Sequence, residues 1–185
     1  YAVATTTGTS AMHASLLLVG VGFNDEVITQ SLTFVATCNS IFYCGAKPIF
    51  IDVDKDTMGL SPEALIQFLE KNTLIKNDVC INKTTQKTIK ACVPMHTFGH
   101  PCRISEIKDI CDKYNILLIF DEVQTGFGST GKLWCYEHYG VTPHILTFGK
   151  KAQISGVCIG GHIPEIENVT NVPGRLSPTW NGDIT

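Results

Sequence analysis

The sequence predicts a three-layer α/β/α fold, in which helices cover both faces of a mostly parallel β-sheet. Short runs of β-branched and aliphatic residues alternate with helical segments along the 185 residues, as in parallel sheets whose strands are joined by helical crossovers. Hydrophobic residues make up 44% of the chain, which is enough for a domain with its own core. No repeat, low-complexity tract or linker divides it. We therefore expect one continuous domain over residues 1–185.

Capping residues and apolar runs assign the elements in chain order. Thr9 and Ser10 are candidate caps of an apolar helix that runs to about Val19. Pro62, after Ser61, occupies the first position of a later helix, where its missing N–H costs no hydrogen bond. Two further helices are expected over about 34–44 and 104–114, and an exposed turn or hairpin at 82–85. The expected strands are residues 27–29, 48–53, 89–95, 116–120, 146–148 and 156–159.

Charge and cysteine usage exclude several classes of protein. The net charge is -3 and no Lys/Arg run is interleaved with aromatics, so we expect no nucleic-acid partner and no anionic membrane partner. No apolar run approaches the roughly 20 residues of a spanning helix, and no secretory or transit signal is visible. Eight scattered cysteines without Cys-x-x-Cys spacing indicate reduced thiols in a cytoplasmic protein. No His pair at ligand spacing lies near a Cys pair, so no metal site is expected.

Two charged side chains follow neighbouring predicted strands. Asp121 comes directly after the strand 116–120, and Lys150 follows the strand 146–148. Ligands of parallel sheets bind outside the carboxyl ends of the strands. An aspartate can keep the pyridine nitrogen of pyridoxal phosphate protonated, and a lysine can carry this cofactor as a Schiff base. The pair therefore predicts a pyridoxal phosphate site.

Two other interpretations of these residues stay open. Asp121 with Glu122 is also typical of an acid pair that binds metal in nucleotide hydrolases, and Lys150 with Lys151 is typical of a solvated surface pair. A nucleotide hydrolase would also need a Gly-x-x-x-x-Gly-Lys-Ser/Thr loop, which this sequence lacks.

Further residues at strand ends support the cofactor hypothesis when they are taken together. The segment Gly8–Ser10 opens a helix, where free amide groups and hydroxyls form a phosphate site. Phe34 follows the strand 27–29 and can cover one face of a planar cofactor, and Gln124 follows the strand 116–120. Taken singly, the first is an ordinary helix cap, Phe34 a core residue, and His96 and His100 turn residues. Their joint order favours the cofactor site.

Residues 2–119 closely resemble the sugar-nucleotide aminotransferases of the DegT/StrS group. The branch they resemble most acts on 4-keto-6-deoxy amino-sugar nucleotides on the way to legionaminic-type sugars. The resemblance is carried by residues 2–4, 8–13, 25–29, 32–37, 45–48 and 93–99.

From residue 119 to 185 the sequence resembles class III aminotransferases instead, especially lysine ε-aminotransferase and 4-aminobutyrate aminotransferase. The carriers are residues 120–134, 148–151 and 175–180. The chain looks like two related enzymes joined near residues 116–121. Both families share the fold type I architecture of pyridoxal phosphate enzymes. The resemblance therefore implies a partial large domain over residues 1–185, with no small domain.

The two resemblances imply roles for individual residues. The first suggests that Thr9, with Gly8 and Ser10 beside it, lies near the cofactor phosphate and that Phe34 stacks on the pyridine ring. The second suggests Asp121 on the pyridine nitrogen, Gln124 near the ring hydroxyl and Lys150 as the Schiff-base lysine.

Two departures from the class III pattern accompany these roles. His144 stands where class III proteins have an aspartate before the lysine. Thr179 resembles a threonine that reaches the phosphate of the neighbouring subunit, but residues 181–183 depart from the usual Gly-Gly-Asn that follows it.

The expected function is that of a pyridoxal phosphate-dependent aminotransferase. It would move an amino group between glutamate or 2-oxoglutarate and a 4-keto-6-deoxy sugar nucleotide, so its partners are a small-molecule amino donor and a keto acceptor. A homodimer is expected if the fold is complete. One alternative is a class III transaminase acting on the ε-amino group of lysine. A second is a non-catalytic chimeric fragment that at most binds the cofactor.

Overall fold

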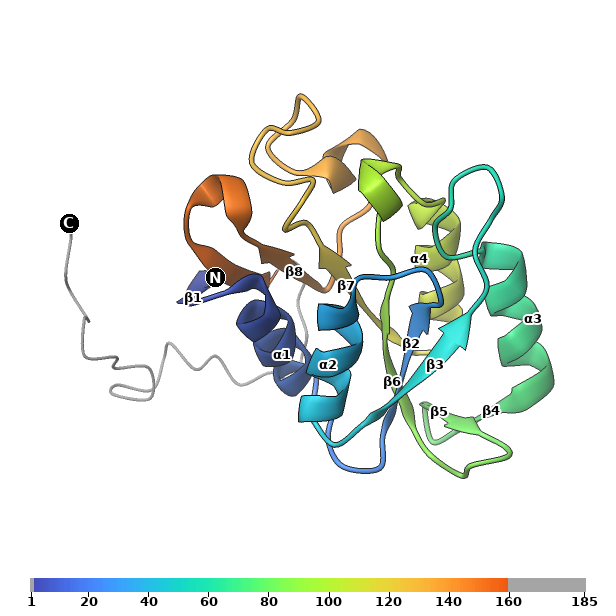
Figure 1. The fold of residues 1–185 in the computed structure, drawn as a ribbon. Helices are drawn as coiled ribbons and strands as arrows, with labels where there is room; N and C mark the ends of the chain where they lie inside the picture. The colour runs from blue at the N-terminus through green and yellow to red at the C-terminus, as the bar shows by residue number, and fades with distance from the viewer. Residues whose placement is uncertain (1, 160–185) are drawn as a thin grey trace.

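The computed structural model describes residues 2–159, which form a seven-stranded sheet with helices on both faces (Figure 1). The strand order is β1-β9-β8-β7-β6-β2-β3. The strands of this sheet are β1 (Ala2–Thr5), β2 (Glu26–Gln30), β3 (Lys47–Ile51), β6 (Ile89–Val93), β7 (Leu117–Asp121), β8 (Ile145–Phe148) and β9 (Ser155–Ile159). The helices are α1 (Gly8–Leu18), α2 (Val35–Tyr43), α3 (Pro62–Asn72) and α4 (Ile104–Lys113), with short 3-10 helices η1 (Thr97–Gly99), η2 (Cys135–His138) and η3 (Lys150–Ala152).

The sheet separates two hydrophobic cores, as the three-layer prediction requires. Successive residues of a strand point to opposite faces, so Leu118 packs in the core beneath α3 and α4, whereas Ile119 packs in the core beneath α1 and α2. Val27 and Ile28 in β2 divide in the same way. Strands buried on both faces are continuous apolar runs. The predicted fold class is therefore confirmed.

In the described sheet six strands run in the same direction, and only β9 runs against them. β8, β7, β6, β2 and β3 run in the same direction, and β9 pairs antiparallel with β8. β1 pairs antiparallel with β9 at one end of the sheet. β1 was not among the predicted strands: its apolar run is only three residues long, and its positions alternate between exposed and half-buried.

The segment between α3 and β6 forms a hairpin that the sequence located only in part. β4 (Thr73–Lys76) pairs antiparallel with β5 (Val79–Asn82). Asn77 and Asp78 connect them with φ angles of 51° and 60°, the left-handed conformation that two-residue hairpin loops need and that Asn and Asp tolerate. The predicted turn at 82–85 is also present, as the exposed turn that follows β5.

Several predicted boundaries move by a few residues. The strand predicted over 89–95 ends at Val93, because Pro94 has no N–H with which to continue the ladder. The predicted caps of α1 are wrong: Thr9 and Ser10 lie inside its first turn, and Thr7 is the N-cap, with its Oγ1 accepting the Ser10 N–H at 3.1 Å. None of the helices in residues 2–159 has the length and hydrophobicity of a membrane-spanning helix.

Candidate cofactor site

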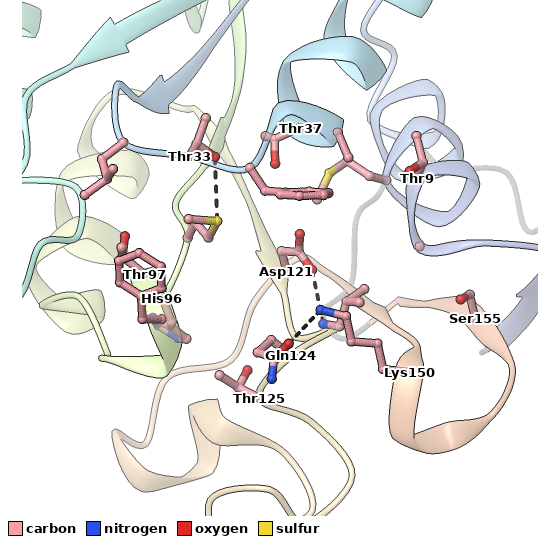
Figure 2. A pocket seen from close by; sticks show the side chains of 18 residues that line it. Thr9, Thr33, Thr37, His96, Thr97, Asp121, Gln124, Thr125, Lys150 and Ser155 are labelled. Atoms are coloured by element: carbon pink, nitrogen blue, oxygen red, sulfur yellow. Dashed lines mark hydrogen bonds between the residues drawn. The ribbon is translucent and has the colours of Figure 1, made fainter.

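A cavity of about 700 Å³ lies where α1 begins and where the parallel strands β2, β6, β7 and β8 end. Its volume is within the range of small-molecule sites, roughly 300–1,000 Å³. Figure 2 shows that its side chains converge from several segments. The predicted site residues that line it are Gly8, Thr9, Phe34, Asp121, Gln124 and Lys150. Ser10 is not among the lining residues, and Thr179 lies outside the described residues.

Asp121 ends β7 and is held by its neighbours in a fixed orientation. Its Oδ1 accepts the Val123 N–H at 3.1 Å and the Thr147 hydroxyl at 3.2 Å. Burial raises the pKa of Asp121, and these two hydrogen bonds and the charge of Lys150 oppose that rise. Both hydrogen bonds use Oδ1, so Oδ2 can accept from a donor in the cavity. A protonated ring nitrogen is a donor of this kind, and its positive charge would favour the ionised carboxylate.

The two lysines of the pair point to different places. Lys150 lines the cavity, and its Nζ donates to Gln124 Oε1 at 2.6 Å (Figure 2). Lys151 Nζ instead donates to Ser129 Oγ at 2.7 Å. Lys150 also has a φ of 48°, a left-handed conformation that is uncommon for residues other than glycine and that clusters at functional sites. Both lysines are exposed, but of the two only Lys150 lines the cavity.

The start of α1 supplies a site for an anion. Gly8 and Thr9 are its first residues and both line the cavity, where the first amide groups of a helix have no partner within the helix. A Cβ at Gly8 would lie 3.1 Å from Val123 Cγ2, so glycine lets the helix approach the end of β7 closely. The hydroxyl of Ser10 is used within the cap, 3.0 Å from Thr7 Oγ1.

Phe34 presents an open aromatic face to the cavity. It is the N-cap residue of α2, and 68% of its surface is exposed. The alternative that Phe34 is a core residue is therefore wrong. An exposed ring in a cavity is suited to cover one face of a planar ligand.

Glu122 has a role that the sequence analysis did not identify. It is buried, and its carboxylate accepts the N–H groups of Cys135 at 2.7 Å and Tyr136 at 2.8 Å and the Thr125 hydroxyl at 3.3 Å. These bonds close the loop 122–136 against the end of β7. Residues 2–159 contain no group of three His, Cys, Asp or Glu side chains arranged to hold a metal ion.

His96 is the N-cap residue of η1 and forms part of the cavity wall. Its Nδ1 accepts the Cys102 N–H at 3.2 Å. Burial lowers the pKa of His96 to about 4, so the ring is neutral near pH 7. The sequence carries no signal that His96 is buried. Its hydrogen-bond partner is the N–H of Cys102, on the far side of η1, and this contact exists only in the folded chain.

The fold and the cavity together are those of the fold type I class of pyridoxal phosphate-binding proteins, and the residues present fit the cofactor. The matches to known proteins identify the family. The sequence profile of the DegT/DnrJ/EryC1/StrS aminotransferase family matches residues 1–134. The chain therefore belongs to this family, and pyridoxal phosphate is its cofactor.

Individual relatives agree with this assignment. GDP-perosamine synthase from Escherichia coli O157:H7 is 34% identical over 156 residues, which cover 84% of this chain and 38% of the relative. Among solved structures, NtdA from Bacillus subtilis with bound cofactor PMP has a TM-score of 0.65 at 22% identity, over 88% of this chain and 34% of that chain. The described residues thus share the fold of this solved structure.

A second family matches the later part of the chain. The class III aminotransferase profile matches residues 97–185. L-lysine-epsilon aminotransferase from Mycobacterium tuberculosis (strain H37Rv) is 49% identical over 80 residues, which cover 43% of this chain and 18% of the relative. The two profiles overlap at residues 97–134, a range that contains the predicted change of resemblance at 116–121. The chain spans well under half of the length of these relatives.

Proposed function

We propose that this chain is part of an aminotransferase that moves an amino group between glutamate or 2-oxoglutarate and a 4-keto-6-deoxy sugar nucleotide. The observation that carries the proposal is the convergence of Asp121, Gln124 and Lys150 in one cavity with the start of α1. The substrate class is supported by the longer family match and by two GDP-perosamine synthases, 34% and 33% identical over 84% of this chain. The residues 1–185 would then form part of the large domain.

Each cavity residue has a defined task in this proposal. Pyridoxal phosphate, when bound, supplies an electron-withdrawing ring that lowers the barrier to moving a proton on the substrate. Lys150 Nζ would hold the cofactor and then, once released, accept and return that proton. Asp121 Oδ2 would hold the ring nitrogen protonated, and Gln124 Oε1 would orient the lysine amine. Phe34 would cover one face of the ring.

The phosphate group of the cofactor would lie at the start of α1. The amide groups of Gly8 and Thr9, which begin α1 and line the cavity, would bind it. Thr179 remains a sequence prediction for the same phosphate in a neighbouring subunit.

Chemical trapping tests the lysine assignment. The chain would be incubated with pyridoxal phosphate and reduced with borohydride, and the modified peptide would be identified by mass spectrometry. We expect the label on Lys150. Lys150→Ala should abolish both the label and the visible absorbance of the bound cofactor, whereas Lys151→Ala, which removes only the bond to Ser129, should keep both. A label on Lys151 would contradict the proposal.

A second candidate function has its own support. The 49% identity to L-lysine-epsilon aminotransferase favours the ε-amino group of lysine as an alternative donor. The cofactor spectrum separates the two functions. If the sugar is the acceptor, glutamate should convert the loaded chain to its amine form, and a keto sugar nucleotide added next should restore the original spectrum. If lysine is the donor, lysine alone should convert the loaded chain. A chain that carries no label on any lysine would instead be the non-catalytic fragment.

A second copy of the chain is the proposed protein partner. Leu17 on α1 and Val35, Phe42 and Tyr43 on α2 are exposed, and α2 contains no charged residue. An apolar, uncharged face of this kind is typical of an interface. In a dimer the same face of two copies can meet, and without charged residues there is no like-charge repulsion between them. Light scattering should give the mass of a dimer, and Phe42→Glu should shift it towards the monomer. An unchanged mass in the variant would exclude this face as the interface.

The cytoplasm is the proposed compartment. All eight cysteines are free, and all lie within the described residues. Reduced thiols in this number are expected in a reducing environment.

A further inference from the structure

Phe98 combines two unfavourable properties that the proposed cofactor site does not explain. Its φ is 52° and its ψ is 22°, in the left-handed region that side chains with a Cβ rarely adopt. Its surface is 84% exposed, so its ring contributes little to the core. Strain of this kind is retained where a function needs it, and Phe98 lines the cavity.

A buried hydrogen-bond network holds this residue in place. Gln30, fully buried at the end of β2, donates from Nε2 to Thr97 Oγ1 at 2.8 Å and accepts the Met95 N–H on Oε1 at 2.9 Å. Thr97 Oγ1 in turn donates to the carbonyl oxygen of Met58 at 2.8 Å. Thr97, which directly precedes the strained position, is thus tied to the end of β2 and to the loop between β3 and α3. The position of the Phe98 backbone is therefore built into the fold.

Phe98 lines the cavity on the segment η1, next to Thr97. Figure 2 shows His96 and Thr97 on one side of Asp121, and Lys150 and Thr9 on the other. The cofactor residues thus leave the side near Phe98 for the substrate.

The cavity wall around Phe98 is uncharged. Its other members are Met95, Thr97 and His96, whose pKa burial lowers to about 4. An uncharged wall with an exposed aromatic ring suits the apolar C–H face of a sugar ring, and it offers no cation to a diphosphate. The diphosphate would then lie away from this wall.

We propose that Phe98 packs against the sugar ring of the keto acceptor and so determines its affinity, an inference that rests on the proposed function. Phe34 and Phe98 would divide the cavity between them, with the first on the cofactor and the second on the sugar. Gln30 and Thr97 would act as positioning residues for the second ring.

The test compares two ligands on matched variants. Calorimetry would measure the binding of a GDP-linked 4-keto-6-deoxyhexose, and of GDP alone, to the full chain loaded with pyridoxal phosphate, a form that has no amino group to transfer. Phe98→Asn removes the ring, and asparagine tolerates the left-handed backbone. Phe98→Tyr keeps the ring.

The expected result is a loss of affinity that is specific to the sugar. Phe98→Asn should bind the sugar nucleotide about tenfold more weakly and GDP unchanged, and Phe98→Tyr should bind both as the wild type does. Equal weakening for both ligands would place the ring on the nucleotide and overturn the proposal. An unchanged affinity, or no binding of the sugar nucleotide by the wild type, would also overturn it.

Borohydride labelling of the same samples separates this inference from the cofactor assignment. We expect Lys150 to be labelled in the wild type and in both Phe98 variants. A label on Lys150 together with unchanged sugar affinity refutes the role of Phe98 alone. Absence of the label refutes the proposed function.

Discussion

The substitution Glu122→Gln tests whether a buried carboxylate keeps the end of β7 in its functional conformation. Glu122 accepts the N–H groups of Cys135 and Tyr136 on different oxygens. Glutamine has the same shape but replaces one acceptor oxygen with an NH2 group. One of the two backbone N–H groups must therefore face another donor and lose its partner.

The expected loss of stability follows from these contacts. A buried N–H group without a partner costs roughly 1–3 kcal/mol, and the remaining bond changes from a charge-assisted to a neutral one. Burial raises the pKa of Glu122, which shows that desolvation offsets part of what the carboxylate contributes. We therefore expect a net loss of about 2 kcal/mol in the free energy of unfolding.

Urea unfolding at pH 7 measures this loss, with Glu137→Gln as the control. Glu137 lies in the same loop and accepts the Trp134 N–H at 2.8 Å, but it is exposed, so its loss should cost less than about 0.5 kcal/mol. In a thermal scan, Glu122→Gln should lower the Tm by roughly 4–8 °C. Equal effects of the two substitutions would refute the reasoning.

Three further predictions concern the site and its support. Asp121→Asn keeps an acceptor for the Val123 N–H but removes the charge, so turnover should fall on the order of 100-fold or more while cofactor affinity changes little; equal turnover would contradict the role of the carboxylate. His96 has a pKa lowered from 6.5 to about 4, so below pH 6.5 the unfolded chain binds a proton that the folded chain does not. The folded state therefore loses stability as the pH falls from about 6.5 to about 4. Between pH 7 and pH 5, the free energy of unfolding of His96→Asn, measured in urea, should fall by about 2 kcal/mol less than that of the wild type. Parallel curves of unfolding free energy against pH for the two proteins would disprove this. Gly156→Ala places a Cβ 2.5 Å from the Val3 carbonyl oxygen and 2.4 Å from Phe148 Cζ, so we expect a loss of roughly 1–3 kcal/mol by the same method, and an unchanged midpoint would show that the strands can separate.

The sequence predicted those site residues whose functional group and whose position at the end of a strand can both be recognised from the neighbouring residues. Asp121 and Lys150 carry ionisable groups directly after apolar strands, and parallel strands bring such ends together. The strand 116–120 was equally clear, because burial on both faces leaves a continuous apolar run.

The parts that the sequence did not predict depend on partners far along the chain. The amide of Gln30 bonds to Thr97, 67 residues away, and nothing near Gln30 in the sequence indicates this contact. Glu122 likewise acts through two backbone groups of the loop that follows it. Roles of this kind depend on the tertiary fold rather than on residue type.

The position of β1 at the edge of the sheet affects how the chain must fold. Ala2 pairs with Cys158 and Thr5 with Ser155, so the first strand finds its partner only when almost all of the described chain is present. A ribosome releases residues 2–5 long before residues 155–159, and until then β1 has no strand to join. Contacts between such distant residues slow folding, and an unpaired strand is prone to associate with other chains. Within the described residues, β1 therefore pairs with a strand only after β9 has formed.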